Sequence, residues 1–133
     1  MMLDDGRDID NVSARMGMTS FVIMVMSGPD DGQKIYLSQE YGDGKLDEDN
    51  RWVLMFGRRE ECDVSIPFDT QVSRRHAVLR VTGDRRFLLE DMGSLNGTFV
   101  GKMRIEEPTV VERGELFRLG RTWMRIQPGE GAE

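Results

Sequence analysis

The spacing of short apolar runs constrains the fold of this chain most. Between Phe21 and Gln127 such runs recur about every 8 to 12 residues, with glycine-bearing turns between them. No stretch sustains the 3.6-residue periodicity of an amphipathic helix. The pattern therefore predicts an all-β, antiparallel sandwich. The predicted strands lie at 21–26, 34–37, 52–56, 63–67, 77–81, 86–90, 98–100, 109–111, 116–119 and 122–127.

The length of 133 residues fits one domain with tails. We assign the domain to residues 19–128. Residues 1–18 contain four aspartates and few large apolar side chains, which predicts a flexible acidic tail. Residues 129–133 form a short C-terminal tail. Within the domain, residues 38–50 carry five acids and two glycines, the composition of an exposed loop.

Rare residue types limit the chemistry. The single cysteine, Cys62, and the single histidine, His76, provide neither an internal disulfide nor a His/Cys metal site, so we expect no metal and no cofactor. No apolar run reaches about 18 residues, which argues against membrane insertion. The acidic start also lacks the layout of a signal peptide, and we expect a cytoplasmic protein.

The charge is distributed unevenly. Residues 51–127 hold 14 Lys/Arg against 11 Asp/Glu, a balance of +3, whereas the remainder holds 4 against 13, a balance of -9, and the two sum to the net charge of -6. An acidic chain of this kind is a poor nucleic-acid binder, because affinity for the phosphate backbone needs a broad basic face. We therefore expect no nucleic acid among its partners.

Three short motifs lie where apolar runs begin or end: Gly57-Arg58, Ser73-Arg74-Arg75-His76 and Gly93-Ser94-Leu95-Asn96-Gly97-Thr98. An arginine can bond two phosphate oxygens at once, a serine hydroxyl can donate a third hydrogen bond, and an asparagine amide can hold a peptide main chain. Each motif alone also has an ordinary interpretation, as a surface arginine, a turn serine or an Asn-Gly hairpin turn. Together they provide what a phosphate on an extended peptide needs.

The order of these motifs resembles that of the forkhead-associated (FHA) domain, a family that reads phosphothreonine peptides. The resemblance spans residues 21–127 and rests on Phe56-Gly57-Arg58, Val72 to Ala77, Leu89 to Val100, and Leu116 to Gly120. It implies a sandwich of about eleven strands whose loops at one end bind the peptide. It also implies a non-catalytic recognition module in signalling, with an upstream Ser/Thr protein kinase and a phosphothreonine-containing protein as partners.

The resemblance assigns roles to individual residues. Arg58 becomes the main phosphate ligand and Ser73 a hydroxyl donor to phosphate, while Arg74 reaches the phosphate or the peptide backbone. Asn96 pairs with the peptide main chain just after the phosphothreonine. Its neighbour Leu95 stands where family members carry threonine or serine, so it can offer the peptide only an apolar contact.

Further positions follow from the same resemblance. Gln71 lies where the family reads the third residue beyond the phosphothreonine, and its uncharged amide argues against a strongly acidic preference there. His76 buttresses the binding loop. Gly57, Gly93 and Gly97 shape the backbone of the site.

Two other functions remain open at this point. One is a sandwich of the same kind that binds a protein without needing phosphate, against which the complete set of Arg58, Ser73 and Asn96 argues. The other is a hydrolase that uses Ser73 and His76 with Asp91. The sequence lacks a glycine-flanked nucleophile elbow and a second base, which argues against the enzyme.

Overall fold

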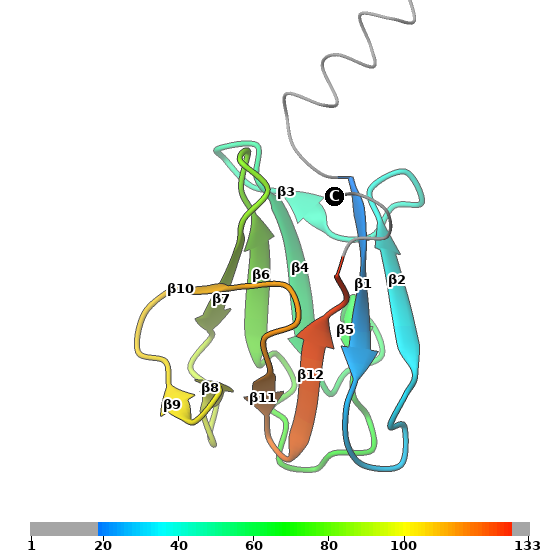
Figure 1. The fold of residues 1–133 in the computed structure, drawn as a ribbon, viewed down its shortest axis with the longest axis vertical. Coiled ribbons are helices and arrows are strands. Elements are labelled where there is room, and N and C mark those ends of the chain that lie inside the picture. Colours follow the sequence, from blue (N-terminus) through cyan, green and yellow to red (C-terminus); the bar gives the residue numbers. More distant parts are fainter. Residues whose placement is uncertain (1–18, 129–133) are drawn as a thin grey trace, which may run out of the picture.

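The computed structural model describes residues 19–128, which form twelve strands in two facing sheets (Figure 1). Sheet A contains β2 (Lys34–Ser38), β1 (Ser20–Val25), β12 (Thr122–Ile126), β11 (Phe117–Leu119), β8 (Thr98–Val100) and β9 (Met103–Arg104), in that spatial order. Sheet B contains β10 (Thr109–Val111), β7 (Phe87–Asp91), β6 (Ala77–Val81), β4 (Trp52–Gly57) and β3 (Lys45–Leu46), with β5 (Val64–Ser65) beside β4. The predicted tails at 1–18 and 129–133 lie outside the described residues.

The prediction of an all-β sandwich is confirmed, with two differences in detail. The strands β3 and β9, each of two residues, fall in segments interpreted from sequence as a loop and a turn. The pair formed by β4 and β5 is parallel, with Phe56 opposite Val64, in an otherwise antiparallel structure. Both features involve strands of only two residues, which are too short to show a pattern of their own, although their pairing partners lie within eight residues along the chain. None of the described residues belongs to a helix long and apolar enough to cross a membrane.

Alternating side chains fill the space between the sheets. Phe21, Ile23 and Val25 of β1 are buried, and the residues between them face outward, as the two-residue period of a strand requires. Phe21 packs edge-on against Trp52 and Phe87, with ring centroids 5.3 Å and 5.0 Å apart. Each fully buried aromatic or aliphatic side chain stabilises the fold by about 1.5 to 3 kcal/mol.

Strand β4 carries this core to one end of the sandwich. Trp52, Leu54 and Phe56 all point inward and are buried, and the Phe56 ring meets Phe117 of sheet A at 6.0 Å. This packing fixes the end of β4, so Gly57 and Arg58 leave the sheet at a defined position.

Residues 38–50 form hydrogen bonds and an ion pair with other parts of the chain that their composition did not predict. The Trp52 indole N–H donates to the Asp43 carbonyl at 2.8 Å, and the Gly44 N–H donates to the Asp63 carboxylate at 2.8 Å. The Asp47 carboxylate forms an ion pair with Arg80 at 3.5 Å. These contacts hold the segment, with β3 inside it, along the edge of β4.

Candidate functional site

Three loops meet at the end of the sandwich where β4 and β7 finish and β6 and β8 begin, the lower end in Figure 1. They are the segment that follows β4 and carries Arg58, the segment 66–76 that precedes β6, and the β7–β8 connection at 92–97. The three sequence motifs occupy these three loops. Residues that are up to 39 positions apart, from Arg58 to Gly97, thus come together at one surface.

The backbones around Arg58 and Ser73 are joined directly. The Arg58 N–H donates to the Ser73 carbonyl at 3.0 Å, and the Gly57 carbonyl accepts from Ile66 at 2.8 Å. A Cβ atom on Gly57 would lie 2.8 Å from the carbonyl carbon of Arg74 and closer still to its oxygen. Gly57 is therefore required for this close approach, and its φ is not in the left-handed region.

The Ser73 side chain links two of the loops. Its Oγ accepts the N–H of Leu95 at 3.1 Å, which fixes the side chain across the gap between the 66–76 and 92–97 segments. A serine hydroxyl has one proton to donate besides its two acceptor positions. Since the acceptor side faces Leu95, the proton stays available for a ligand.

His76 is buried beneath this surface, and both ring nitrogens are engaged by backbone groups. Its Nδ1 accepts the N–H of Ser73 at 3.0 Å, so Nε2 carries the proton and donates to the Gly97 carbonyl at 2.9 Å. Burial lowers the pKa of His76, although the bond to Gly97 and the nearby Asp91 carboxylate oppose this effect. His76 is neutral, and its two hydrogen bonds connect the loop that carries Ser73 with the loop that carries Gly97.

This geometry bears on the hydrolase alternative. The His76 ring bonds the backbone N–H of Ser73 and not its hydroxyl, and no ring nitrogen is left to accept the hydroxyl proton. The Asp91 carboxylate lies 4.0 Å from Nε2 and is occupied elsewhere. The three residues are close but are not arranged as a nucleophile with its base.

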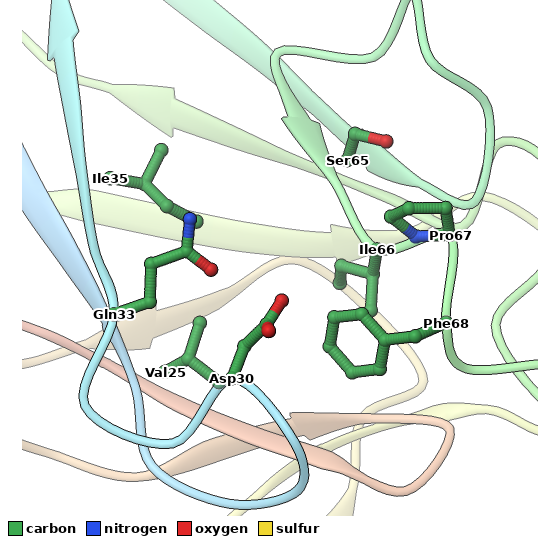
Figure 2. Close-up of a pocket in the computed structure, with 8 residues that line it drawn as sticks. All are labelled: Val25, Asp30, Gln33, Ile35, Ser65, Ile66, Pro67 and Phe68. Atoms are coloured by element: carbon green, nitrogen blue, oxygen red, sulfur yellow. The ribbon is translucent and has the colours of Figure 1, made fainter.

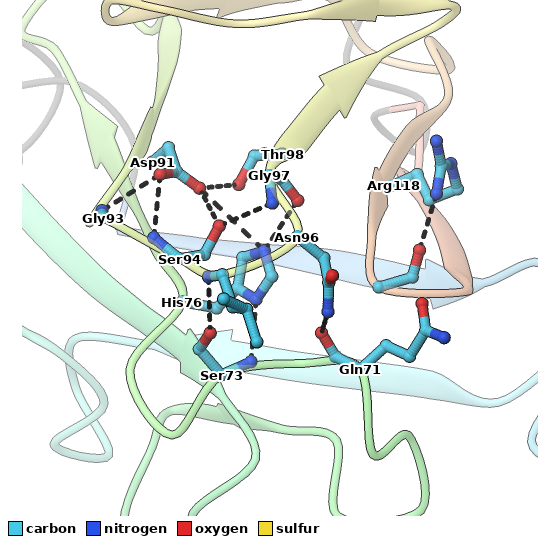
Figure 3. A network of polar contacts seen from close by, with 12 residues as sticks. Gln71, Ser73, His76, Asp91, Gly93, Ser94, Asn96, Gly97, Thr98 and Arg118 are labelled. Carbon is cyan, nitrogen blue, oxygen red and sulfur yellow. Dashed lines mark hydrogen bonds and ion pairs between the residues drawn. The ribbon is translucent and has the colours of Figure 1, made fainter.

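Asp91 instead organises the β7–β8 loop (Figure 3). One carboxylate oxygen accepts the N–H groups of Gly93 and Ser94, each at 3.0 Å, and the other accepts the hydroxyls of Ser94 and Thr98 at 2.5 and 2.7 Å. Burial raises the pKa of Asp91, but the bonds from the Ser94 and Thr98 hydroxyls and from the backbone N–H groups together hold the pKa below its usual value. Sequence reasoning missed this role, although an Asp two residues before a Gly-Ser pair is a signal for an Asx turn.

The glycines of this loop serve the turn. Gly93 and Gly97 have φ angles of +78° and +88°, which residues with a side chain rarely adopt. Gly97 also lets Arg104 approach, because a Cβ atom there would lie 2.7 Å from the Arg104 Nε.

A hydrogen bond brings Asn96 and the Gln71 backbone together. The Asn96 amide nitrogen donates to the Gln71 carbonyl at 2.9 Å (Figure 3). The Asn96 side chain has a second N–H and an acceptor oxygen, and neither forms a hydrogen bond with the described residues 19–128. The Gln71 N–H donates to Asp69, whose carboxylate also accepts from Arg121 and from the Thr122 hydroxyl. Asp69 thus ties this loop to sheet A, a role that sequence reasoning did not assign.

The first two loops also carry cations. Arg58 is half-buried and Arg74 is exposed, and neither guanidinium has a carboxylate partner in the described part of the chain. In the third loop, Leu95 is 84% exposed. Arg59 differs, since its guanidinium lies 3.4 Å from the Glu61 carboxylate.

A hollow of about 360 Å³ lies between the β1–β2 turn and the residues after β5 (Figure 2). Its lining combines apolar side chains such as Ile35 and Phe68 with the Asp30 carboxylate. It contains none of the predicted site residues and carries no cation, so it is unsuited to an anionic ligand.

A β-sandwich that presents an arginine, a hydroxyl proton and a carboxamide from loops at one end defines a peptide-binding module of the phosphate-reading class. The sequence profile of the FHA domain matches residues 54–120, half of the chain. The chain belongs to the FHA family, whose members bind phosphothreonine peptides.

Individual relatives agree with this assignment. The oxoglutarate dehydrogenase inhibitor of Corynebacterium jeikeium is 31% identical over 102 residues, covering 77% of this chain and 60% of the relative. The glycogen accumulation regulator GarA of Mycolicibacterium smegmatis is 30% identical, covering 77% of this chain and 55% of GarA. The chain thus spans only part of the length of these relatives. A solved structure from work on phosphothreonine-dependent FHA domain interactions superposes with a TM-score of 0.64 at 27% identity, covering 84% of this chain and 99% of its own.

Proposed function

We propose that this chain is a non-catalytic reader of phosphothreonine peptides. It acts in the cytoplasm, downstream of a Ser/Thr kinase that phosphorylates its protein partner. Arg58 is the principal phosphate ligand, Ser73 donates a further hydrogen bond and Arg74 adds a second cation. Asn96 holds the peptide main chain next to the phosphothreonine, between Leu95 and the Gln71 loop.

The observation that carries this proposal is the arrangement of free donors around Ser73. Leu95 occupies its acceptor side, which leaves the hydroxyl proton for a ligand, and Arg58 is attached to the Ser73 carbonyl through its own backbone. The two donor groups therefore share one rigid support. A phosphate near -2 in charge gains most from donors that are already in place.

The decisive experiment compares Arg58 variants with a neighbouring control. We expect Arg58→Ala to remove measurable phosphopeptide binding, a loss of about 2 to 5 kcal/mol, because the phosphate is left partly unpaired. Arg58→Lys should recover only part of the loss, since lysine supplies charge without the planar fork. Arg59→Ala removes one adjacent arginine that is already paired with Glu61, and should leave affinity nearly unchanged.

Calorimetric titration of a phosphothreonine peptide, and of the same peptide without phosphate, measures both effects. If Arg58→Ala folds and binds the phosphorylated peptide as the wild type does, the phosphate-reading assignment fails. The sandwich would then be an interaction module that needs no phosphate.

Two further variants separate the other contacts. Ser73→Ala should cost about 1.5 to 3 kcal/mol, the range for a hydrogen bond to a charged group. Asn96→Ala should weaken binding of the phosphorylated peptide but retain the preference for phosphorylated over unphosphorylated peptide. If Asn96→Ala lost that preference, Asn96 would itself be needed to recognise the phosphate, and the roles proposed for the three side chains would be wrong.

A further inference from the structure

The strands of sheet A carry cations and no acid. Their charged residues are Lys34, Arg104, Arg118 and Arg125. This is a notable bias in a chain with 24 acidic residues and a net charge of -6. The strand neighbours that alternate with these cations, such as Phe117 and Met124, are buried in the core, so the cations point away from it.

Strand pairing arranges these cations in a row across the outer face. Met24 lies opposite both Lys34 and Arg125, and Phe99 lies opposite both Arg118 and Arg104. Trp123, two residues before Arg125 on β12, lies opposite Arg118 and joins the two halves. From one edge strand to the other, the cationic row consists of Lys34, Met24, Arg125, Trp123, Arg118, Phe99 and Arg104. At about 4.8 Å between strands, the row extends about 24 Å across the six strands.

The cations of the row are not neutralised within the described residues. No carboxylate of residues 19–128 lies within ion-pair distance of any of them. The Arg118 guanidinium stacks 4.1 Å from the Phe99 ring centroid and 5.4 Å from that of Trp123. The guanidinium of Arg125 contacts the Met24 sulfur at 3.9 Å, and its buried Nε has no partner.

We propose that the cationic row is a docking surface for an acidic, extended segment of a protein partner, in which Asp or Glu residues are interspersed with apolar ones. Carboxylates pair with the four cations, and apolar side chains pack on Met24, Trp123 and the neighbouring Tyr36, which is 70% exposed. A row of about 24 Å matches about seven residues of extended chain.

The overall charge favours a short protein segment over a long polyanion. A nucleic acid or an anionic membrane surface would extend beyond the row onto a molecule whose net charge is -6. A short acidic segment can end within the row and avoid that repulsion. At its far end the row meets Gly97, where Arg104 packs, so that end of the segment lies next to the proposed phosphopeptide site.

The test titrates the full chain, at low and at high salt, with an unphosphorylated peptide of about eight residues in which pairs of Glu alternate with pairs of Leu, so that each face of the extended peptide carries both residue types. The variant Lys34→Glu/Arg125→Glu reverses two cations of the row, and Arg51→Glu/Arg86→Glu reverses two exposed arginines elsewhere, so both change the net charge equally. We expect binding at low salt that weakens about tenfold or more in the first variant and less than about twofold in the second. Lys34→Glu alone, at an exposed position, should weaken binding about threefold and covers the case in which the double variant fails to fold.

Several results would overturn this proposal. They are an absence of binding by the wild type at low salt, an equal loss in the two double variants, or tighter binding of oligothymidylate or of phosphatidylserine vesicles than of the peptide. Self-association that Lys34→Glu abolishes would make a second copy the occupant. Amide chemical shifts that move in the Arg58 and Ser73 loops, and not in β1 and β12, would also refute it. Phosphothreonine-peptide binding should survive in the row variants, so this proposal and the phosphate-reading function fail separately.

Discussion

Replacing Gly57 by alanine tests whether the backbone that supports Arg58 depends on close packing. A Cβ atom at this position would lie 2.8 Å from the Arg74 carbonyl carbon, closer to its oxygen, and 2.9 Å from the Cys62 sulfur. Because carbon atoms make ordinary contact at about 3.5 to 4.0 Å, the Arg74 carbonyl must retreat by about 1 Å. Alanine adopts the φ angle of Gly57 without strain, so the cost is steric.

The size of the effect follows from the contacts that would move. Overpacking of this kind costs about 1 to 3 kcal/mol. The Cys62 thiol donates to the Arg74 carbonyl at 3.3 Å, and the neighbouring Ser73 carbonyl accepts from Arg58 at 3.0 Å. Weakening these bonds adds about 0.5 to 1.5 kcal/mol. We expect Gly57→Ala to lower the free energy of unfolding by about 2 to 4 kcal/mol, and Tm by about 8 to 16 °C at about 4 °C per kcal/mol.

Gly83 provides the matched control. It lies in the β6–β7 turn, its φ is not in the left-handed region, and a Cβ atom there would meet nothing within 4 Å. Gly83→Ala should therefore change the free energy of unfolding by less than about 0.5 kcal/mol. Denaturant unfolding of the three proteins gives this comparison, and phosphopeptide titration should show weaker binding for Gly57→Ala alone. Equal stability of Gly57→Ala and wild type would refute the packing argument.

Three further predictions address binding and stability. Phosphothreonine should bind several-fold more tightly than phosphoserine in matched peptides, since a filled methyl pocket contributes about 1 kcal/mol; equal titration curves would contradict this. Deleting residues 1–18, with their four aspartates, should raise the association rate of an acidic phosphopeptide at low salt and change it little at high salt, as stopped-flow measurements can show. Burial lowers the pKa of His76 in the folded protein below its ordinary value of about 6.5, so the unfolded chain takes up a proton first as the pH falls. The contribution of neutral His76 to the free energy of unfolding is therefore fully present above about pH 6.5 and should decline as the pH falls toward the folded pKa. A His76→Gln variant with an unaltered decline between pH 6.5 and 5 would refute that assignment.

The fold class was predictable because short apolar runs recur between glycine-bearing turns, a pattern that is local and needs no knowledge of partners. In the apolar run that begins at Phe21, the sequence did not show that Phe21, Ile23 and Val25 are the buried side chains, because the residues between them are also apolar. The pairing of β5 alongside β4 was not predictable, because parallel pairing of two residues depends on where the chain returns. The acidic composition of residues 38–50 correctly indicated exposure, since none of these residues is buried, but it did not reveal that their carboxylates and carbonyls bond to Arg80 and Trp52 of other strands.

The glycines of the site show how far motif reasoning extends. All three were interpreted as residues that shape the backbone, and Gly93 and Gly97 do so through positive φ. Gly57 serves by lacking a side chain where the Arg74 carbonyl approaches, a reason that only coordinates reveal. The bonds of Asp91 with Ser94 and Thr98 were equally hidden, because each residue has an ordinary role in a turn when considered alone.

The neutral state of His76 explains why the proposed phosphate site can be rigid before a ligand arrives. A protonated ring could not accept the Ser73 N–H, and one of the two bonds that join the loops at Ser73 and Gly97 would be lost. A positive charge placed beneath the site would attract phosphate, but it would do so at the expense of the geometry that positions the Ser73 hydroxyl. In the proposed function the half-buried Arg58 and the exposed Arg74 provide the charge instead, at positions that water can reach in the free protein. The phosphate would then meet donors that are already oriented, which reduces the entropy lost on binding.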